Sequence, residues 1–263
     1  MRTEGKTMNR IAYGLVTFLL VSLAWIVSSS AAEKPLLMEL ASSTLNISTF
    51  YNGTTLEVTG SVPEDMDVAL QVSGPKKEVH LKEKGKVAGF LWMNKTDVSL
   101  ENTPAVYMVY TPPGAIDKFL SSELGLGYKA LSKDITINPE SEDKAFIFAE
   151  YVKLMEHSGV YAIHEGAVSY GESNGNMKGF SVTLDIPSKM SPGNYQIKAL
   201  AIKDGAIIDE TQENLSMELT GLPAYIAKMA FGQPLLFGII AVVIAIATGL
   251  IIGTIFKGGK GSH

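Results

Sequence analysis

The chain contains no cysteine among its 263 residues, and its only arginines stand at positions 2 and 10. Without thiols it can form neither disulfides nor Cys-ligated zinc sites, so its folded part needs an ordinary apolar core. Bidentate contacts with phosphate or guanine need arginine, and residues 33–221 have none but carry 16 Lys and 26 Asp or Glu, a net charge of −10. We therefore expect no nucleic-acid partner.

Groups that could perform catalysis or bind metals are also sparse. The histidines at 80, 157 and 164 lack zinc-ligand spacing, and the methionines form no cluster suited to Cu(I). Residues 171–175 match the G-x-S-x-G pattern around Ser173, but strand-like residues follow, and His263 is the only later histidine. We predict a Gly/Asn-rich turn there, no catalytic, cofactor or metal residues, and no enzymatic activity.

Residues 235–256 form an uncharged apolar run that Lys257 closes. As a helix rising about 1.5 Å per residue, the run spans roughly 33 Å, enough to cross a hydrocarbon core of about 30 Å. Pro234 suits the first helical position because its missing N–H is not needed there. We predict a transmembrane helix over residues 234–256, embedded in the lipid bilayer, and a tail over residues 257–263.

The amino terminus has the layout of a secretory signal peptide over residues 1–32: basic residues, an apolar stretch over 11–27, and small residues at Ser30 and Ala32. An uncleaved signal anchor is the alternative. Export followed by a stop-transfer helix places residues 33–221 outside the cytoplasm. The basic residues Lys257 and Lys260 then mark the tail as cytoplasmic. We expect a single-pass protein of the inner (plasma) membrane.

Period-two alternation dominates residues 33–113, as in Leu56, Val58 and Val62, and predicts half-buried strands. Asn52-Gly53 between two such runs predicts a type I′ hairpin, because both residues accept positive φ. Further strands are expected at residues 87–92, 97–100 and 105–110. About seven short strands indicate a mainly β fold, with an immunoglobulin-like β-sandwich as the first domain.

Residues 114–221 read as a second, smaller β-rich domain with one amphipathic helix. Asn138 and Pro139 predict the start of that helix, and Gly159 predicts its end. Strand patterning returns at residues 182–186, and Asp204-Gly205 predicts a hairpin turn. Residues 222–233 then form a juxtamembrane connector.

Two sets of residues are candidates for contacts with a partner. Small residues at intervals of four, Ala241, Ala245, Gly249 and Gly253, form one ridge that lets another transmembrane helix approach closely. That helix belongs either to a permease or to a second copy of the chain. Trp92, Asn94 and Tyr107 are candidates for a surface interaction patch, although core or turn roles are the default for each.

Four segments carry a family resemblance: VAGFLWMN at residues 87–94, PAVY at 104–107, SPGNY at 191–195 and GQPLLFG at 232–238. With them the chain resembles a family of transmembrane proteins first grouped from alphaproteobacteria. The resemblance implies an exported chain with one carboxyl-terminal anchor and no assigned activity. Members are often encoded near permeases similar to the sulfite exporters, which implies an accessory role.

Two functional hypotheses follow. The first is a membrane-anchored accessory or scaffolding protein outside the cytoplasm, associated with a polytopic transporter such as a sulfite-exporter-like permease. The alternative is a periplasmic receptor domain that binds a ligand or a metal.

Overall fold

A computed structural model describes residues 36–87, 90–120, 124–139 and 143–257. The predicted signal peptide and residues 258–263 of the predicted tail lie outside these ranges. The strands are β1 (Leu37–Leu40), β2 (Thr44–Ile47), β3 (Thr54–Pro63), β4 (Asp67–Ser73), β5 (Lys76–Val87), β6 (Leu91–Pro104), β7 (Tyr107–Thr111), β8 (Thr136–Asn138), β9 (Tyr161–Glu165), β10 (Val168–Ser173), β11 (Met177–Ile186), β12 (Gly193–Lys203) and β13 (Ala206–Leu219). The helices are α2 (Ile116–Phe119), α3 (Tyr128–Asp134), α4 (Lys144–His157), α5 (Gly221–Gly232) and α6 (Pro234–Lys257).

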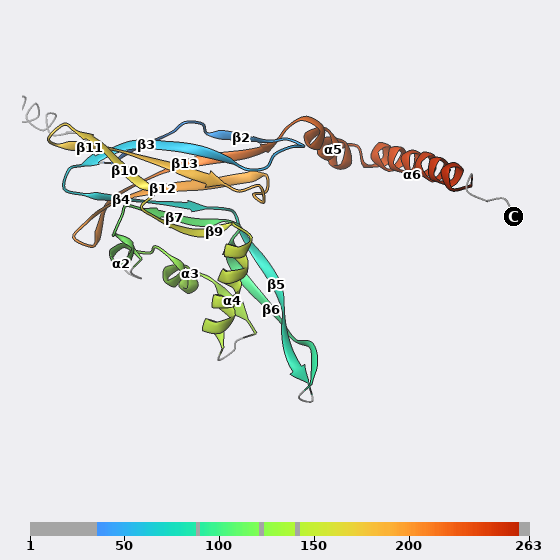
Figure 1. The fold of residues 1–263 in the computed structure, drawn as a ribbon, viewed down its shortest axis with the longest axis horizontal. Coiled ribbons are helices and arrows are strands. Elements are labelled where there is room, and N and C mark those ends of the chain that lie inside the picture. Colours follow the sequence, from blue (N-terminus) through green and yellow to red (C-terminus); the bar gives the residue numbers. More distant parts are fainter. Residues whose placement is uncertain (1–35, 88–89, 121–123, 140–142, 258–263) are drawn as a thin grey trace, which may run out of the picture. The chain divides into compact units, whose positions relative to one another are not determined.

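Over the described ranges the strands form three sheets (Figure 1). One has the order β1-β3-β11-β10, the second β2-β13-β12-β4-β7-β9, and the third β5-β6-β8. The pairs β2–β13 and β7–β9 are parallel, and the other pairs are antiparallel. The predicted mainly β fold with a carboxyl-terminal apolar helix is confirmed.

The two larger sheets share one buried core. Val58 and Leu184 of the first sheet and Leu70 and Ile197 of the second belong to the same apolar cluster. Alternation in β3 and β11 sends every second side chain into this cluster, which is why the period-two pattern was visible in the sequence.

Strands from both predicted β domains pair with one another, which differs from the predicted division after residue 113. β3 pairs with β11 along its whole length, with Val58 opposite Val182. β4 pairs with β12, with Leu70 opposite Ala199. The boundary between residues 113 and 114 therefore runs through shared sheets and does not separate two cores.

The two predicted hairpin turns have different outcomes. Asp204 and Gly205 have φ values of 51° and 78° and join β12 to β13 with Lys203 opposite Ala206, so this hairpin is confirmed. The prediction at Asn52-Gly53 is wrong. Gly53 has a φ of 89°, but Asn52 does not adopt positive φ, and β2 and β3 on either side enter different sheets.

The structure also corrects two predicted elements. Residues 87–92 are not one strand, because β5 ends at Val87 and β6 begins at Leu91. The predicted helix begins at Lys144 instead of Pro139. Asn138 belongs to β8, and its Nδ2 donates a hydrogen bond to Glu101 Oε1 at 2.7 Å instead of capping a helix. The predicted end is confirmed, since α4 ends at His157 and Gly159 has a φ of 76°.

The predicted juxtamembrane connector before the anchor is mostly helical. α5 covers residues 221–232 and has no buried residue. After Gln233, α6 follows, and its residues Pro234–Phe256 form the one helical stretch within the described ranges that is long and apolar enough to cross a membrane.

Candidate functional site

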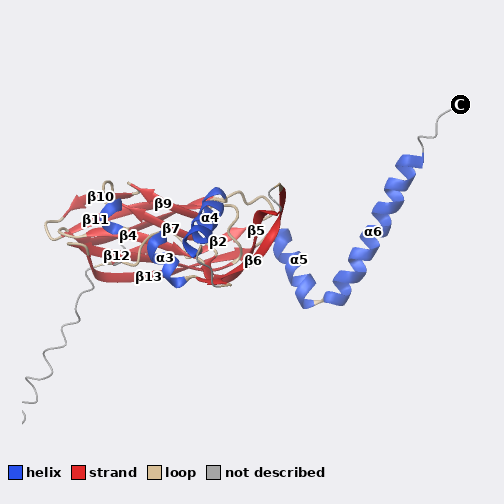
Figure 2. Cartoon of the chain, turned by 90° about the horizontal axis from the view of Figure 1, so that it is seen from below, coloured by secondary structure: helices blue, strands red, loops and turns tan. Residues whose placement is uncertain are grey.

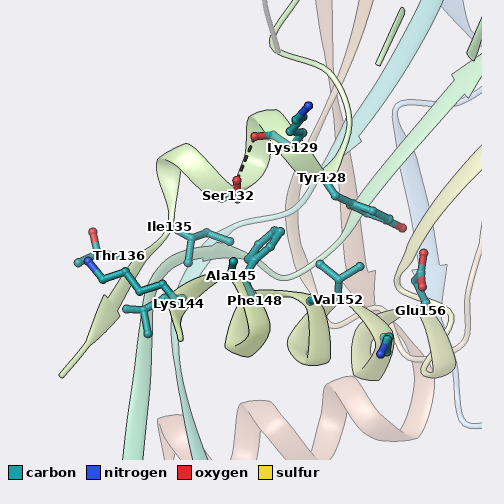
Figure 3. Close-up of a pocket in the computed structure, with 13 residues that line it drawn as sticks. Tyr128, Lys129, Ser132, Ile135, Thr136, Lys144, Ala145, Phe148, Val152 and Glu156 are labelled. Carbon is teal, nitrogen blue, oxygen red and sulfur yellow. Dashed lines mark hydrogen bonds between the residues drawn. The ribbon is translucent and has the colours of Figure 1, made fainter. Parts of the chain in front are cut away.

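A cleft of about 750 Å³ lies between α3, β8 and α4 (Figure 3). Its size is in the range of small-molecule sites, about 300–1,000 Å³. Its apolar lining comes from β8, from α4 and from the residue that follows α3: Ile135, Ile137, Ala145, Phe148, Ala149 and Val152. Helix α3 itself contributes Tyr128, Lys129 and Ser132. We call this hollow the α3–α4 cleft.

Charged and polar groups surround the α3–α4 cleft. Figure 3 shows the Lys144 side chain extending toward Thr136 at one end, and Glu156 beside Tyr128 at the other. Lys129 and Lys153 also contribute to the lining, and the Lys153 ammonium forms an ion pair with Glu150 at 2.7 Å. The cleft thus combines an apolar floor with cationic groups and one carboxylate.

Tyr128 places a polar atom inside this apolar lining. Its hydroxyl is buried and has no hydrogen bond of ordinary length within the described part of the protein, but the Glu156 carboxylate is close enough to interact with it. Burial, together with the neighbouring Glu156 carboxylate, raises the pKa of the Tyr128 phenol. The hydroxyl therefore stays protonated at neutral pH, and an acceptor atom of a bound molecule would satisfy it.

A cluster of four tyrosines joins α3 and α4 to the six-stranded sheet. Figure 2 shows these two helices in front of the strands. Tyr128 of α3 lies 6.2 Å from Tyr107 of β7 and 6.3 Å from Tyr161 of β9, between ring centroids. Tyr151 of α4 meets Tyr161 edge-on at 5.8 Å. Aromatic pairs in this distance range add to the stability gained from burial. The tyrosine cluster therefore positions α3 and α4.

Hydrogen bonds fix two of these rings. The Tyr161 hydroxyl donates to the Pro104 carbonyl oxygen at 2.8 Å. The Gly127 N–H donates to the Tyr107 hydroxyl at 2.9 Å, just before α3 begins. Burial raises the pKa of Tyr107 to about 12.

A second apolar groove lies on another side of α4, against the β5–β6 hairpin. It has a volume of 370 Å³, and Leu81, Val98, Phe146 and Ile147 contribute to it. Phe146 is 64% exposed. Helix α4 therefore has apolar hollows on two sides.

The structure does not bring the predicted surface patch together. Asn94 is exposed on β6, where the backbone places it opposite Lys84, and Trp92 pairs with Lys86 on the same hairpin. Tyr107 is 2% exposed and belongs to the core. Tyr107 is therefore not part of a surface patch. It has the core role that was the default expectation, because its ring packs within the tyrosine cluster.

The predicted ridge of small residues lies on α6. A Cβ atom added to Gly249 or Gly253 would meet nothing within 4 Å among the described residues. Ala241 and Ala245 are exposed on the same helix. The use of this ridge by another helix stays a prediction.

The remaining residues considered for chemistry lie apart. Ser173 ends β10 in a tight turn, where its Oγ accepts a hydrogen bond from Gly175 N–H at 3.1 Å, so the predicted turn is confirmed. His80 is exposed 3.7 Å from Glu78, His157 ends α4, and His164 stacks on Tyr110. Within the described ranges no three His, Asp or Glu side chains gather as a metal site.

Comparison with protein families gives one match, to the family described as "Putative transmembrane protein (Alph_Pro_TM)", over residues 35–258. The chain belongs to this family. The match extends from the start of the β fold to the end of α6, so the sheets and the spanning helix are both part of what defines Alph_Pro_TM members. A search of curated proteins found no match.

Two solved structures show weak similarity to this Alph_Pro_TM chain. The first is a chain in a structure titled as the structural basis of T cell specificity and activation by the bacterial superantigen toxic shock syndrome toxin-1. It has 7% identity and a TM-score of 0.23, and the match covers 70% of this chain and 99% of that one. The second is a family 123 glycoside hydrolase from Clostridium perfringens. It has 9% identity and a TM-score of 0.24, with 72% and 28% covered. Such low scores support no conclusion about function.

Proposed function

We propose that this protein is an accessory or scaffolding subunit of the inner membrane, with its β fold outside the cytoplasm and its tail inside. Its partner is a polytopic transporter, of which a sulfite-exporter-like permease is the leading candidate. The observation that supports this most is the apolar stretch Pro234–Phe256 of α6. It has 23 residues, and none of its most apolar window is buried against the rest of the described protein.

The ridge on α6 gives the helix a face for association. Residues four apart lie on one side of a helix, so Ala241, Ala245, Gly249 and Gly253 form a continuous strip without bulky side chains. Lipid tails are as apolar as leucine, so contacts between membrane helices depend on close packing, which small residues allow. This strip therefore supports a helix partner.

Exposed apolar side chains on α5 support a position close to the bilayer. Leu222, Tyr225 and Phe231 are 59%, 64% and 89% exposed, on the helix directly before the anchor. Tyrosine and other amphipathic aromatics concentrate at membrane–water interfaces. We infer that α5 lies at headgroup level and holds the β fold near the partner.

Replacing both ridge glycines, Gly249→Leu with Gly253→Leu, should reduce co-purification of the permease from detergent-solubilised membranes by about tenfold or more, which corresponds to about 1.4 kcal/mol. The leucines keep the helix apolar but hold the partner's backbone away. The control is Val243→Leu with Ile251→Leu on the opposite side of α6, which should leave recovery unchanged. Undiminished association of the glycine double variant would contradict the role of the ridge. Loss of cross-linking between two copies, with no permease recovered from the parent chain, would identify self-association instead.

The α3–α4 cleft favours a second candidate function, a receptor domain for a small molecule. Its apolar floor, its lysines and the buried Tyr128 hydroxyl suit an amphipathic anion with an acceptor atom, such as an aromatic sulfonate. Inorganic sulfite is a poorer fit because the lining is mostly apolar. A copper ion is also a poorer fit, since no cluster of ligands lines the cleft.

A thermal-shift titration with naphthalenesulfonate tests the receptor hypothesis on the full-length protein in detergent. Ligand binding to the native state should raise the unfolding temperature saturably. Phe148→Glu, on the cleft floor, should abolish the shift, because it puts a carboxylate where the apolar part of the ligand binds. Phe146→Glu is the matched control, since Phe146 lies outside the cleft on the same helix. An equal shift in both variants would exclude the α3–α4 cleft as the site.

A further inference from the structure

In the outer half of the β5–β6 hairpin, no third strand of the described part of the chain pairs with β5 or β6 (Figure 1). β5 and β6 pair from Lys76–Pro104 to Val87–Leu91, but β8 joins them only at Ser99, Leu100 and Glu101. Two-stranded ribbons are at best marginally stable alone in water. Packing in the core of the domain therefore does not explain why this ribbon extends beyond its sheet.

Large apolar side chains are exposed at the end of this ribbon. Phe90 is 79% exposed, Leu91 51% and Met93 49%. We call these three residues the apolar tip. The turns of the other hairpins differ, since Asn174-Gly175 and Asp204-Gly205 are polar. Exposed clusters of apolar side chains on soluble surfaces mark contact sites for proteins or membranes.

The charge of the ribbon is opposite to that of the rest of the folded segment. Residues 82–97 contain four lysines, one glutamate and one aspartate, a net charge of +2, whereas residues 33–221 together carry −10. The aspartate, Asp97, lies opposite Lys82 and forms an exposed ion pair with it at 3.8 Å. Lys82 and Lys84 are exposed on β5, close to the apolar tip in the chain. This combination is complementary to an anionic surface with an apolar layer behind it.

An anionic bilayer has these properties, and α6 is long and apolar enough to anchor the protein in a bilayer. Only residues 220–233 separate the last strand from the spanning helix. Tethering raises the local concentration of the membrane around the fold, so even a weak contact would be populated. Each lysine near anionic lipids contributes about 1 kcal/mol, and apolar side chains beside lysines are a recurrent composition of interfacial segments.

We propose that the β5–β6 hairpin is a second membrane contact. The apolar tip enters the interfacial region of an anionic bilayer, and Lys82 and Lys84 bind the phosphates of its headgroups. This contact is independent of the proposed permease association, because it uses lipid alone. With α6 it gives the β fold two attachment points and so restricts its orientation above the membrane.

The absence of native cysteine allows a direct test with a single label. Asn94→Cys, next to the apolar tip, would carry an environment-sensitive fluorophore in the full-length protein, reconstituted in vesicles containing phosphatidylglycerol. We expect a blue-shifted emission that brominated lipids quench. Asn174→Cys, in the polar β10–β11 turn, is the matched control and should show neither effect.

Two sets of variants separate the contribution of the apolar tip from that of the two lysines. Phe90→Ser with Leu91→Ser should remove the quenching of the label at position 94. Lys82→Glu with Lys84→Glu should lower the equilibrium constant for insertion about tenfold or more in phosphatidylglycerol vesicles, at about 1 kcal/mol per lysine, and by less in phosphatidylcholine vesicles.

Equal quenching at positions 94 and 174, or quenching that survives the serine variant, would overturn the proposal. So would a label at position 94 that shifts only in native membranes and cross-links there to another protein. That result would assign the apolar tip to a protein partner.

Discussion

Gly60→Ala should destabilise the protein by about 3 kcal/mol, although it adds only one methyl group. Gly60 lies in β3 between β1 and β11, opposite Met38 and Phe180. A Cβ atom at this position would lie 2.1 Å from the Leu37 carbonyl oxygen and 2.4 Å from the Phe180 ring. The carbonyl oxygen belongs to the backbone of a paired strand, so relief requires β1 to move away from β3.

Thermal unfolding of the full-length protein, followed by circular dichroism, measures this effect. For a domain of this size the expected fall in unfolding temperature is about 6–12 °C. Gly179→Ala is the matched control on the neighbouring strand, where the added Cβ would meet its nearest neighbour at 3.9 Å. Equal unfolding temperatures of the two variants would show that β1 does not approach Gly60 as closely as described.

Raising the pH above 10 should unfold the protein through its buried tyrosines. Burial raises the pKa of Tyr107 from 10.0 to about 12. Burial also raises the pKa values of Tyr110, Tyr161 and Tyr170. The unfolded chain then loses protons at a lower pH than the native chain. The contribution of Tyr107 to the free energy of unfolding is therefore fully present below pH 10. It is lost as the pH rises from 10 to 12, and the loss for this residue alone is about 3 kcal/mol.

Parallel titrations check this expectation. Tyrosinate absorbance should rise together with the loss of the β signal, because the rings ionise on unfolding. Tyr107→Phe removes one of the groups, so its loss of stability between neutral and alkaline pH should be smaller than that of the parent chain. Ionisation of most of the tyrosines near pH 10 in a still-folded protein would contradict the burial described for them.

The sequence contained the local pattern of the fold but not its pairing. Alternation at Leu56, Val58 and Val62 predicted β3, because a half-buried strand leaves a period of two. Nothing in that pattern indicates that β3 pairs with β11, since partners distant in the chain share no local signal. The division after residue 113 failed for this reason, and so did the hairpin at Asn52-Gly53.

The α3–α4 cleft was harder to predict than the anchor. The anchor can be recognised from composition alone, because residues 235–256 form one continuous apolar run. The cleft depends on Phe148 and Val152 of α4 facing Ile135 and Tyr128, and the sequence showed only that α4 had an apolar side. Phe146 was one usable signal that α4 has more than one apolar surface. It extends the apolar side of α4 beyond what packing on a single surface needs, and it is exposed in the structure.

The shared sheets also constrain the order in which the chain folds during synthesis. β3 and β4 have to wait for β11 and β12, which follow more than a hundred residues later, and β2 finds its partner only in β13. Contacts between such distant segments form slowly. The strand that completes the six-stranded sheet, β13, thus emerges shortly before the spanning helix, so this sheet closes only when the chain is about to be fixed in the membrane.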